Sequence, residues 1–119
     1  MNKNGSKWIR PEKRLAIYLR DGFSCVVCGK AADDGHVLSL DHVVPRVDSG
    51  TNDSSNLVTL CCGCNSSKQH KDLKQWLIER DSNTASKLYA RIQTQVAKSV
   101  NVAAGKDILA TRKNFALAV

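Results

Sequence analysis

The amino-acid sequence predicts a small α+β fold in one domain, covering residues 1–119. Two short apolar runs have the composition of strands, and several other segments carry apolar residues at helical spacing. Two closely spaced pairs of cysteines flank the strand region. A chain of 119 residues, 42% of them hydrophobic, is long enough to bury a core. This composition argues against a collagen-like or fully disordered chain.

The strand region lies between the two pairs of cysteines. The first strand is expected over 37–44, interrupted by Asp41 and ended by Pro45. The second is expected over 56–60. Residues 46–55 between them are polar and contain glycine, so they are expected to form a loop.

Helices are expected at both ends of the chain. Pro11 suits the first turn of an N-terminal helix, which Asp21 and Gly22 would end. In the second half, Leu88 and Ile92 repeat at helical spacing, and the apolar faces with Trp76 and Tyr89 are expected to pack in the core or a dimer contact. The expected helices cover 10–20, 62 to beyond 68, 72–80, 85–100 and about 103–117.

The charge is unevenly distributed along the chain. The sequence has 18 Lys and Arg against 11 Asp and Glu, for a formal net charge of +7. Residues 1–30 carry seven basic and two acidic side chains, whereas 31–60 carry one arginine and five aspartates. Basic segments on both sides of an acidic one are expected of a metal-dependent enzyme that acts on nucleic acid. Ordinary solvated surface charge is the commoner cause of such a pattern.

The five cysteines indicate a metal site. Cys25 and Cys28 form one C-x-x-C pair, and Cys61 and Cys64 form another. Two such pairs supply the four tetrahedral thiolates of a structural Zn²⁺ ion and leave no position open for a reacting water. No signal peptide precedes them, so a reducing compartment and metal binding are favoured over disulfides. Cys62 is expected to be a buried or half-buried bystander, although it could replace Cys61 as a ligand.

A polar cluster at the end of the first strand indicates catalysis. Adjacent strand residues face opposite sides, so Asp41 could reach a cation while His42 activates a water as a general base. Asn56 opens the second strand, and Asn65 follows the cysteine at position 64 directly, which would hold its oxygen in place. Each residue alone is more often structural, but their combination within one segment pinned by cysteines favours a functional site.

Together these motifs resemble the HNH endonucleases, whose fold is the ββα-metal or His-Me finger fold. The resemblance covers roughly residues 10–72 and implies an HNH nuclease core there, with a helical extension over 73–119. The matching stretches are Arg20 to Gly29, with its C-x-x-C-Gly motif, Leu40 to Pro45, Asn56 to Cys61, and Cys64 to Lys68.

The resemblance also implies a role for each site residue. His42 would be the general base, and Asn56 would orient the loop and the histidine through hydrogen bonds. Asp41 and Asn65 would bind a catalytic Mg²⁺ or Mn²⁺ ion. Some relatives carry histidine where this chain has Asn65, and an amide oxygen favours such hard cations over Zn²⁺ or Ni²⁺. The structural zinc would be held by Cys25, Cys28, Cys61 and Cys64.

The predicted function is a divalent-metal-dependent DNA endonuclease that hydrolyses phosphodiester bonds. A single active site would nick one strand, and double-strand cleavage would need two encounters or a homodimer, for which the C-terminal helices are the candidate surface. The alternative is a non-catalytic, zinc-stabilised module that binds nucleic acid. DNA as the partner follows from the resemblance alone. Without a signal peptide or an apolar run of about 20 residues, no membrane partner and a cytoplasmic location are expected.

Several basic residues near these motifs have two open interpretations. Arg46 or Lys68 could contact phosphate, and for Lys68 a solvated helix position is equally compatible. His70 could be a third metal ligand, but a solvated histidine is favoured. Three residues on one helical side, Lys87, Arg91 and Lys98, could follow a DNA backbone or simply face water.

Overall fold

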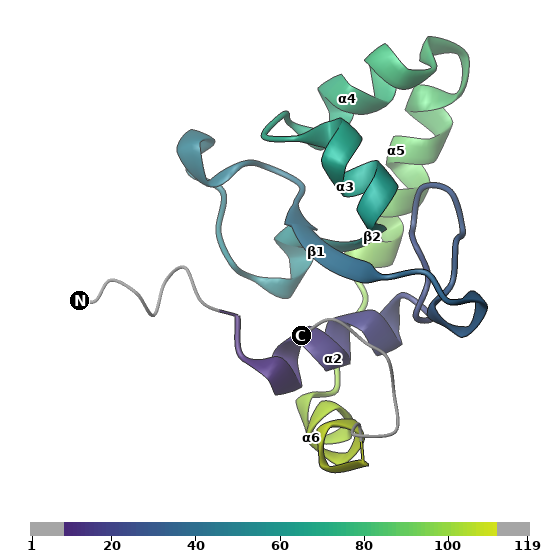
Figure 1. Cartoon of the computed structure of the whole chain (residues 1–119). Helices are drawn as coiled ribbons and strands as arrows, with labels where there is room; N and C mark the ends of the chain where they lie inside the picture. Colours follow the sequence, from purple (N-terminus) through teal and green to yellow (C-terminus); the bar gives the residue numbers. More distant parts are fainter. Residues whose placement is uncertain (1–8, 112–119) are drawn as a thin grey trace.

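The computed structural model describes residues 9–111 and contains a β-hairpin with helices on both sides (Figure 1). In Figure 1, α3, α4 and α5 lie above the hairpin and α2 and α6 below it. This arrangement confirms the predicted α+β fold. In chain order the elements are α2 (Pro11–Arg20), β1 (Leu38–His42), β2 (Leu57–Cys61), α3 (Cys62–Lys68), α4 (Leu73–Arg80), α5 (Ser82–Val96) and α6 (Val102–Thr111), with short 3₁₀ turns at Ala32–Asp34, Arg46–Asp48 and Ser54–Asn56.

The hairpin brings the end of β1 next to the start of β2. The strands pair antiparallel, with Leu38 opposite Cys61 and His42 opposite Leu57. Asp41 lies inside β1, so the expectation that it interrupts the strand is wrong. The strand tolerates the carboxylate because Lys68 of α3 donates a hydrogen bond to it at 3.0 Å.

The N-terminal helix is confirmed, with proline at its start, and it packs closely against α6. Gly105 of α6 makes this approach possible, because a Cβ atom at that position would clash with the carbonyl oxygen of Glu12. The last helix is described as far as Thr111, and the remainder of its predicted span, to Leu117, lies outside the described residues.

The boundaries of α5 differ from the prediction by several residues. The helix begins at Ser82 because the carboxylate of Asp81 accepts a hydrogen bond from the backbone N–H of Asn83 and caps the first turn. It ends at Val96 rather than at residue 100. The periodic apolar pattern predicts which face is buried, but the end of the helix has no such signal.

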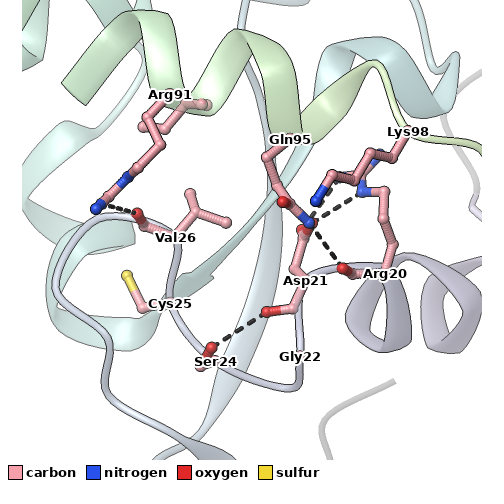
Figure 2. A pocket seen from close by; sticks show the side chains of 10 residues that line it. Arg20, Asp21, Gly22, Ser24, Cys25, Val26, Arg91, Gln95 and Lys98 are labelled. Carbon is pink, nitrogen blue, oxygen red and sulfur yellow. Dashed lines mark hydrogen bonds and ion pairs between the residues drawn. The ribbon is translucent and has the colours of Figure 1, made fainter. Parts of the chain in front are cut away.

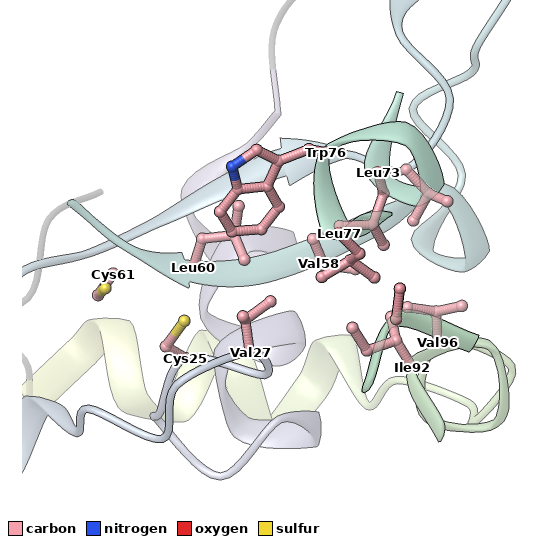
Figure 3. Packing of buried hydrophobic residues seen from close by; sticks show 12 residues of the cluster. Cys25, Val27, Val58, Leu60, Cys61, Leu73, Trp76, Leu77, Ile92 and Val96 are labelled. Carbon is pink, nitrogen blue, oxygen red and sulfur yellow. The ribbon is translucent and has the colours of Figure 1, made fainter. Parts of the chain in front are cut away.

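The main hydrophobic cluster joins the hairpin to α4 and α5 (Figure 3). Val58 and Leu60 of β2 pack with Trp76 of α4, which is only 3% exposed, and with Ile92 of α5. In Figure 3, Cys25 lies at the opposite end of this cluster from Ile92. The helical extension and the cysteine turn are therefore built on one shared core.

None of the helices within residues 9–111 has the length and apolar character that crossing a membrane requires.

Candidate nuclease site and cysteine cluster

Four cysteines from three parts of the fold converge on one point. Cys25 and Cys28 lie on the loop after α2, Cys61 ends β2, and Cys64 lies in the first turn of α3. Their Sγ atoms all lie within 4.8 Å of one another. Tetrahedral Zn²⁺ with Zn–S bonds of about 2.3 Å requires sulfur separations of roughly 3.8 Å, so this donor set fits a zinc ion after a small contraction. The predicted grouping is confirmed.

Electrostatic interactions within the cluster favour the thiolate form of Cys61 over that of Cys28 or Cys64. Burial raises the pKa of Cys64 and of Cys28, and neighbouring thiols add to both effects. Burial also acts on Cys61, but hydrogen bonds from the backbone of Cys64 and from nearby thiols outweigh it and lower its pKa to about 7. Cys62 lies outside the group and is exposed on the first turn of α3, so it is a bystander, but the expected burial is wrong.

At the opposite end of the hairpin, His42 is held by a loop residue. Its Nε2 atom lies 2.7 Å from Oδ1 of Asn52, a hydrogen bond that leaves Nδ1 as the nitrogen with a lone pair when the ring is neutral. A cavity of about 370 Å³ is lined by His42, Arg46, Val47 and Asn52. Asn52 was not predicted as a site residue, because one asparagine in a polar loop has no distinguishing sequence signal.

Asn56 fixes the loop that carries Asn52. Its Oδ1 accepts a hydrogen bond from the backbone N–H of Val44 at 2.9 Å, and its Nδ2 donates to the carbonyls of Val44 and Thr51 at 3.0 and 2.9 Å. Gly50 lets the loop close, because a Cβ atom there would clash with the carbonyl oxygen of Val44. A single side chain thus ties both ends of the loop together.

On the other face of β1, Asp41 forms an ion pair with Lys68 of α3. Lys68 Nζ lies 3.0 Å from Asp41 Oδ2, and the lysine side chain is 1% exposed against 17% for the aspartate. The other carboxylate oxygen of Asp41 accepts the backbone N–H of His42 at 2.8 Å. Lys68 is therefore not the solvated helix residue that remained open from the sequence.

Asn65 lies on the same side of the hairpin as this ion pair. Its Nδ2 donates to Oγ of Ser39 at 2.7 Å, and Ser39 precedes Asp41 by two residues on the same face of β1. Within residues 9–111 no direct hydrogen bond joins Asn65 to Asp41. The two residues nonetheless provide carboxylate and carboxamide oxygens on one face, the donor chemistry that suits a hard divalent cation.

A second, smaller cavity of about 130 Å³ lies at the end of β1. Asp41 and His42 both line it, although they point to opposite sides of the strand. Gln69 has a φ of 57°, a backbone conformation that strains an L residue, and it turns the chain sharply after α3. His70 is exposed and lies at the rim of this cavity. The complete lining is Asp41, His42, Pro45, Arg46, Val47, Lys68, Gln69 and His70.

Comparison with known proteins finds relatives of part of the chain. Residues 25–76 match the HNH endonuclease family model. A curated relative, the CRISPR-associated endonuclease Cas9 of Actinomyces naeslundii, is 38% identical over 64 residues, which are 53% of this chain and 6% of the relative. The crystal structure of the Type II-C Cas9 enzyme from the same organism aligns with 82% of this chain and 12% of its own, at 21% identity and a TM-score of 0.43.

The match to the HNH endonuclease family covers the segment from Cys25 to Trp76, slightly less than half of the chain. This match supports a nuclease-type function and a nucleic-acid substrate. The chain spans only a small fraction of the curated relative it matches, so the activity and partners of that whole protein are not transferred.

Proposed function

We propose that this chain is a divalent-metal-dependent endonuclease that hydrolyses phosphodiester bonds of DNA, with His42 as the general base. The hydrogen bond between His42 Nε2 and Asn52 Oδ1 is the observation that carries this proposal. It orients the imidazole next to an open cavity and leaves Nδ1 able to accept a proton from an attacking water. Asn56 is a positioning residue, because it holds the loop on which Asn52 lies.

Asp41 and Asn65 are the proposed ligands of the catalytic cation, for which Mg²⁺ and Mn²⁺ are the candidates. A hard cation at this position would offset charge on the scissile phosphate and on the leaving oxygen. The backbone N–H of His42 orients the carboxylate of Asp41, and Ser39 restrains the amide of Asn65. The two proposed ligands and the base are thereby held by separate parts of the fold.

The four-cysteine cluster is the proposed structural zinc site. It joins the loop after α2 to the junction of β2 and α3, and Asn65 directly follows one of its ligands. One zinc per chain is expected. The proposed reaction is nicking of one strand, since one site makes one cut in each encounter. Paired cuts would need either two encounters or a homodimer through the C-terminal helices.

The direct test is cleavage of supercoiled plasmid by zinc-loaded protein with added Mg²⁺ or Mn²⁺. We expect conversion to the nicked form, no conversion in EDTA, and a loss of at least about 100-fold in rate for His42→Ala, because general-base catalysis typically contributes that much. His36→Ala is the matched control, because it removes a histidine from the loop before β1.

Zinc content by elemental analysis and circular dichroism should be the same for wild type, His42→Ala and His36→Ala. An intact plasmid with every divalent metal tried would leave the non-catalytic binding module as the better description. Cleavage by His42→Ala at the wild-type rate would refute the role of His42 while retaining the nuclease.

A further inference from the structure

A groove with a basic wall lies at the edge of β2 that does not pair with β1. Its volume is about 410 Å³. One wall is formed by Arg20 at the end of α2 and the loop over 21–26, and the other by one side of α5 (Figure 2). Figure 2 shows Arg91, Gln95 and Lys98 extending from α5 and its C-terminal end toward this loop. The groove contains none of the residues proposed for catalysis.

The inner part of the groove is electrically neutral and fully hydrogen bonded. Arg20 Nε lies 2.8 Å from Asp21 Oδ1, and the side chains of both residues are almost completely buried. The carboxylate of Asp21 also accepts hydrogen bonds from the backbone N–H of Thr59 and from Nε2 of Gln95. No charge is left over from this pair to attract or repel a ligand.

The outer wall, by contrast, carries uncompensated positive charge. Between Ser82 and Lys98 the sequence has three basic residues and no acidic one. Arg91 donates one hydrogen bond, to the carbonyl of Val26 at 3.3 Å, and it is otherwise exposed. The ammonium groups of Lys87 and Lys98 have no hydrogen-bond or ion-pair partner among residues 9–111.

Helical geometry explains why these cations line up. Lys87 and Arg91 are four residues apart, and Lys98 continues the same side beyond the end of α5. The core-facing residues Leu88 and Ile92 lie on the adjacent side, so the basic row runs along the seam where α5 meets the loop. Lys87 and Arg91 are about one helical turn apart, and Arg91 and Lys98 about two turns apart. Such a row of cations is suited to a ligand with repeated negative charges.

We propose that this groove binds the phosphodiester backbone of duplex DNA at phosphates away from the cleavage site. The inference rests on the proposed nucleic-acid substrate and adds a second contact surface to it. Arg91 and Lys98 each neutralise a phosphate, and Lys87 extends the row. Such contacts release counterions and contribute affinity without reading sequence.

The test measures DNA binding rather than cleavage. A fluorescent DNA duplex of about 30 base pairs is titrated with zinc-loaded His42→Ala protein, without added divalent metal, and the affinity is followed between about 50 and 200 mM salt. Replacing Arg91 and Lys98 with Gln should reduce the slope of log affinity against log salt by about 1.8, because each phosphate contact contributes about 0.9.

The matched control replaces Arg80 and Lys106 with Gln, because both residues are exposed and lie outside the groove. It removes the same charge and should change the slope by less than about 0.5. Lys98→Gln alone is the variant least expected to disturb folding, because this side chain is exposed and makes no hydrogen bond or ion pair within residues 9–111. It should reduce the slope by about 0.9 with unchanged zinc content.

An unchanged slope for Lys98→Gln, an equal drop in the control pair, or no binding of the duplex by the parent protein would overturn the inference. Failure of the plasmid assay with intact, salt-dependent binding would instead refute only the proposed catalysis.

Discussion

Two ion pairs within residues 9–111 have at least one buried partner, and they differ in how completely their polar atoms are hydrogen bonded. Arg20 and Asp21 bond to each other twice, and the guanidinium also donates to the carbonyls of Ser54 and Leu57 at 2.8 and 2.7 Å. Lys68, although 1% exposed, donates only to Asp41 among the described residues. The polar atoms of the first pair are saturated with hydrogen-bond partners. In the second pair, the Lys68 ammonium uses only one of its three N–H donors among the described residues.

This difference predicts that the first pair is structural and that the second belongs to the proposed cation site. A saturated pair joins the end of α2 to β2 and α5, and no ligand could improve its bonding. The Lys68 ammonium has one partner and lines the smaller cavity, so it is poised to exchange that partner for a ligand. The comparison predicts that the first pair controls unfolding and the second controls cation binding.

Asp21→Asn tests the structural pair and should have the largest effect on stability. The substitution leaves the guanidinium of Arg20 buried without its counter-charge, which typically costs about 3–5 kcal/mol. We expect the free energy of unfolding, measured by urea denaturation of the zinc-loaded protein, to fall by that amount. Asp33→Asn is a matched control, because Asp33 is exposed in a 3₁₀ turn and should have little effect. A loss below about 1 kcal/mol for Asp21→Asn would remove the distinction between the pairs.

Lys68→Met tests the second pair through metal binding. Asp41 keeps its hydrogen bond from His42 and is 17% exposed, so the loss of stability should be only about 1–2 kcal/mol. If the ammonium competes with a cation for the carboxylate, Mn²⁺ should bind at least about tenfold more tightly, a gain of about 1.4 kcal/mol. Isothermal titration calorimetry measures this directly.

Two controls define the result for Lys68. Asp41→Asn should abolish the Mn²⁺ signal, since it removes the proposed charged ligand. Lys71→Met removes an exposed lysine that pairs with Glu79 on the surface, and it should leave the affinity unchanged. Equal Mn²⁺ affinity in wild type and Lys68→Met would contradict competition at Asp41.

The sequence predicts the parts of this site that depend on local spacing. Two C-x-x-C pairs define the metal cluster, and alternation along a strand places Asp41 and His42 on opposite sides. It does not predict contacts between side chains distant in sequence. The burial of Lys68 depends on how α3 crosses β1, and the pairing of His42 with Asn52 depends on the closure of the loop. Neither of these contacts leaves a periodic pattern in the sequence from which it could be predicted.

Asn56→Ala tests the loop that brings Asn52 to His42, and it should have the smallest effect on global stability. Its three hydrogen bonds lie at the surface, so their loss should cost about 1 kcal/mol in total. Hydrogen exchange should instead report local opening, because the backbone N–H of Val44 loses its acceptor. Asn56→Asp keeps an oxygen that can accept from the Val44 N–H but has no N–H donor, so it should protect that amide while still loosening Thr51. Equal protection of Val44 in wild type and Asn56→Ala would mean that the loop is held by other contacts and that Asn56 does not position the histidine.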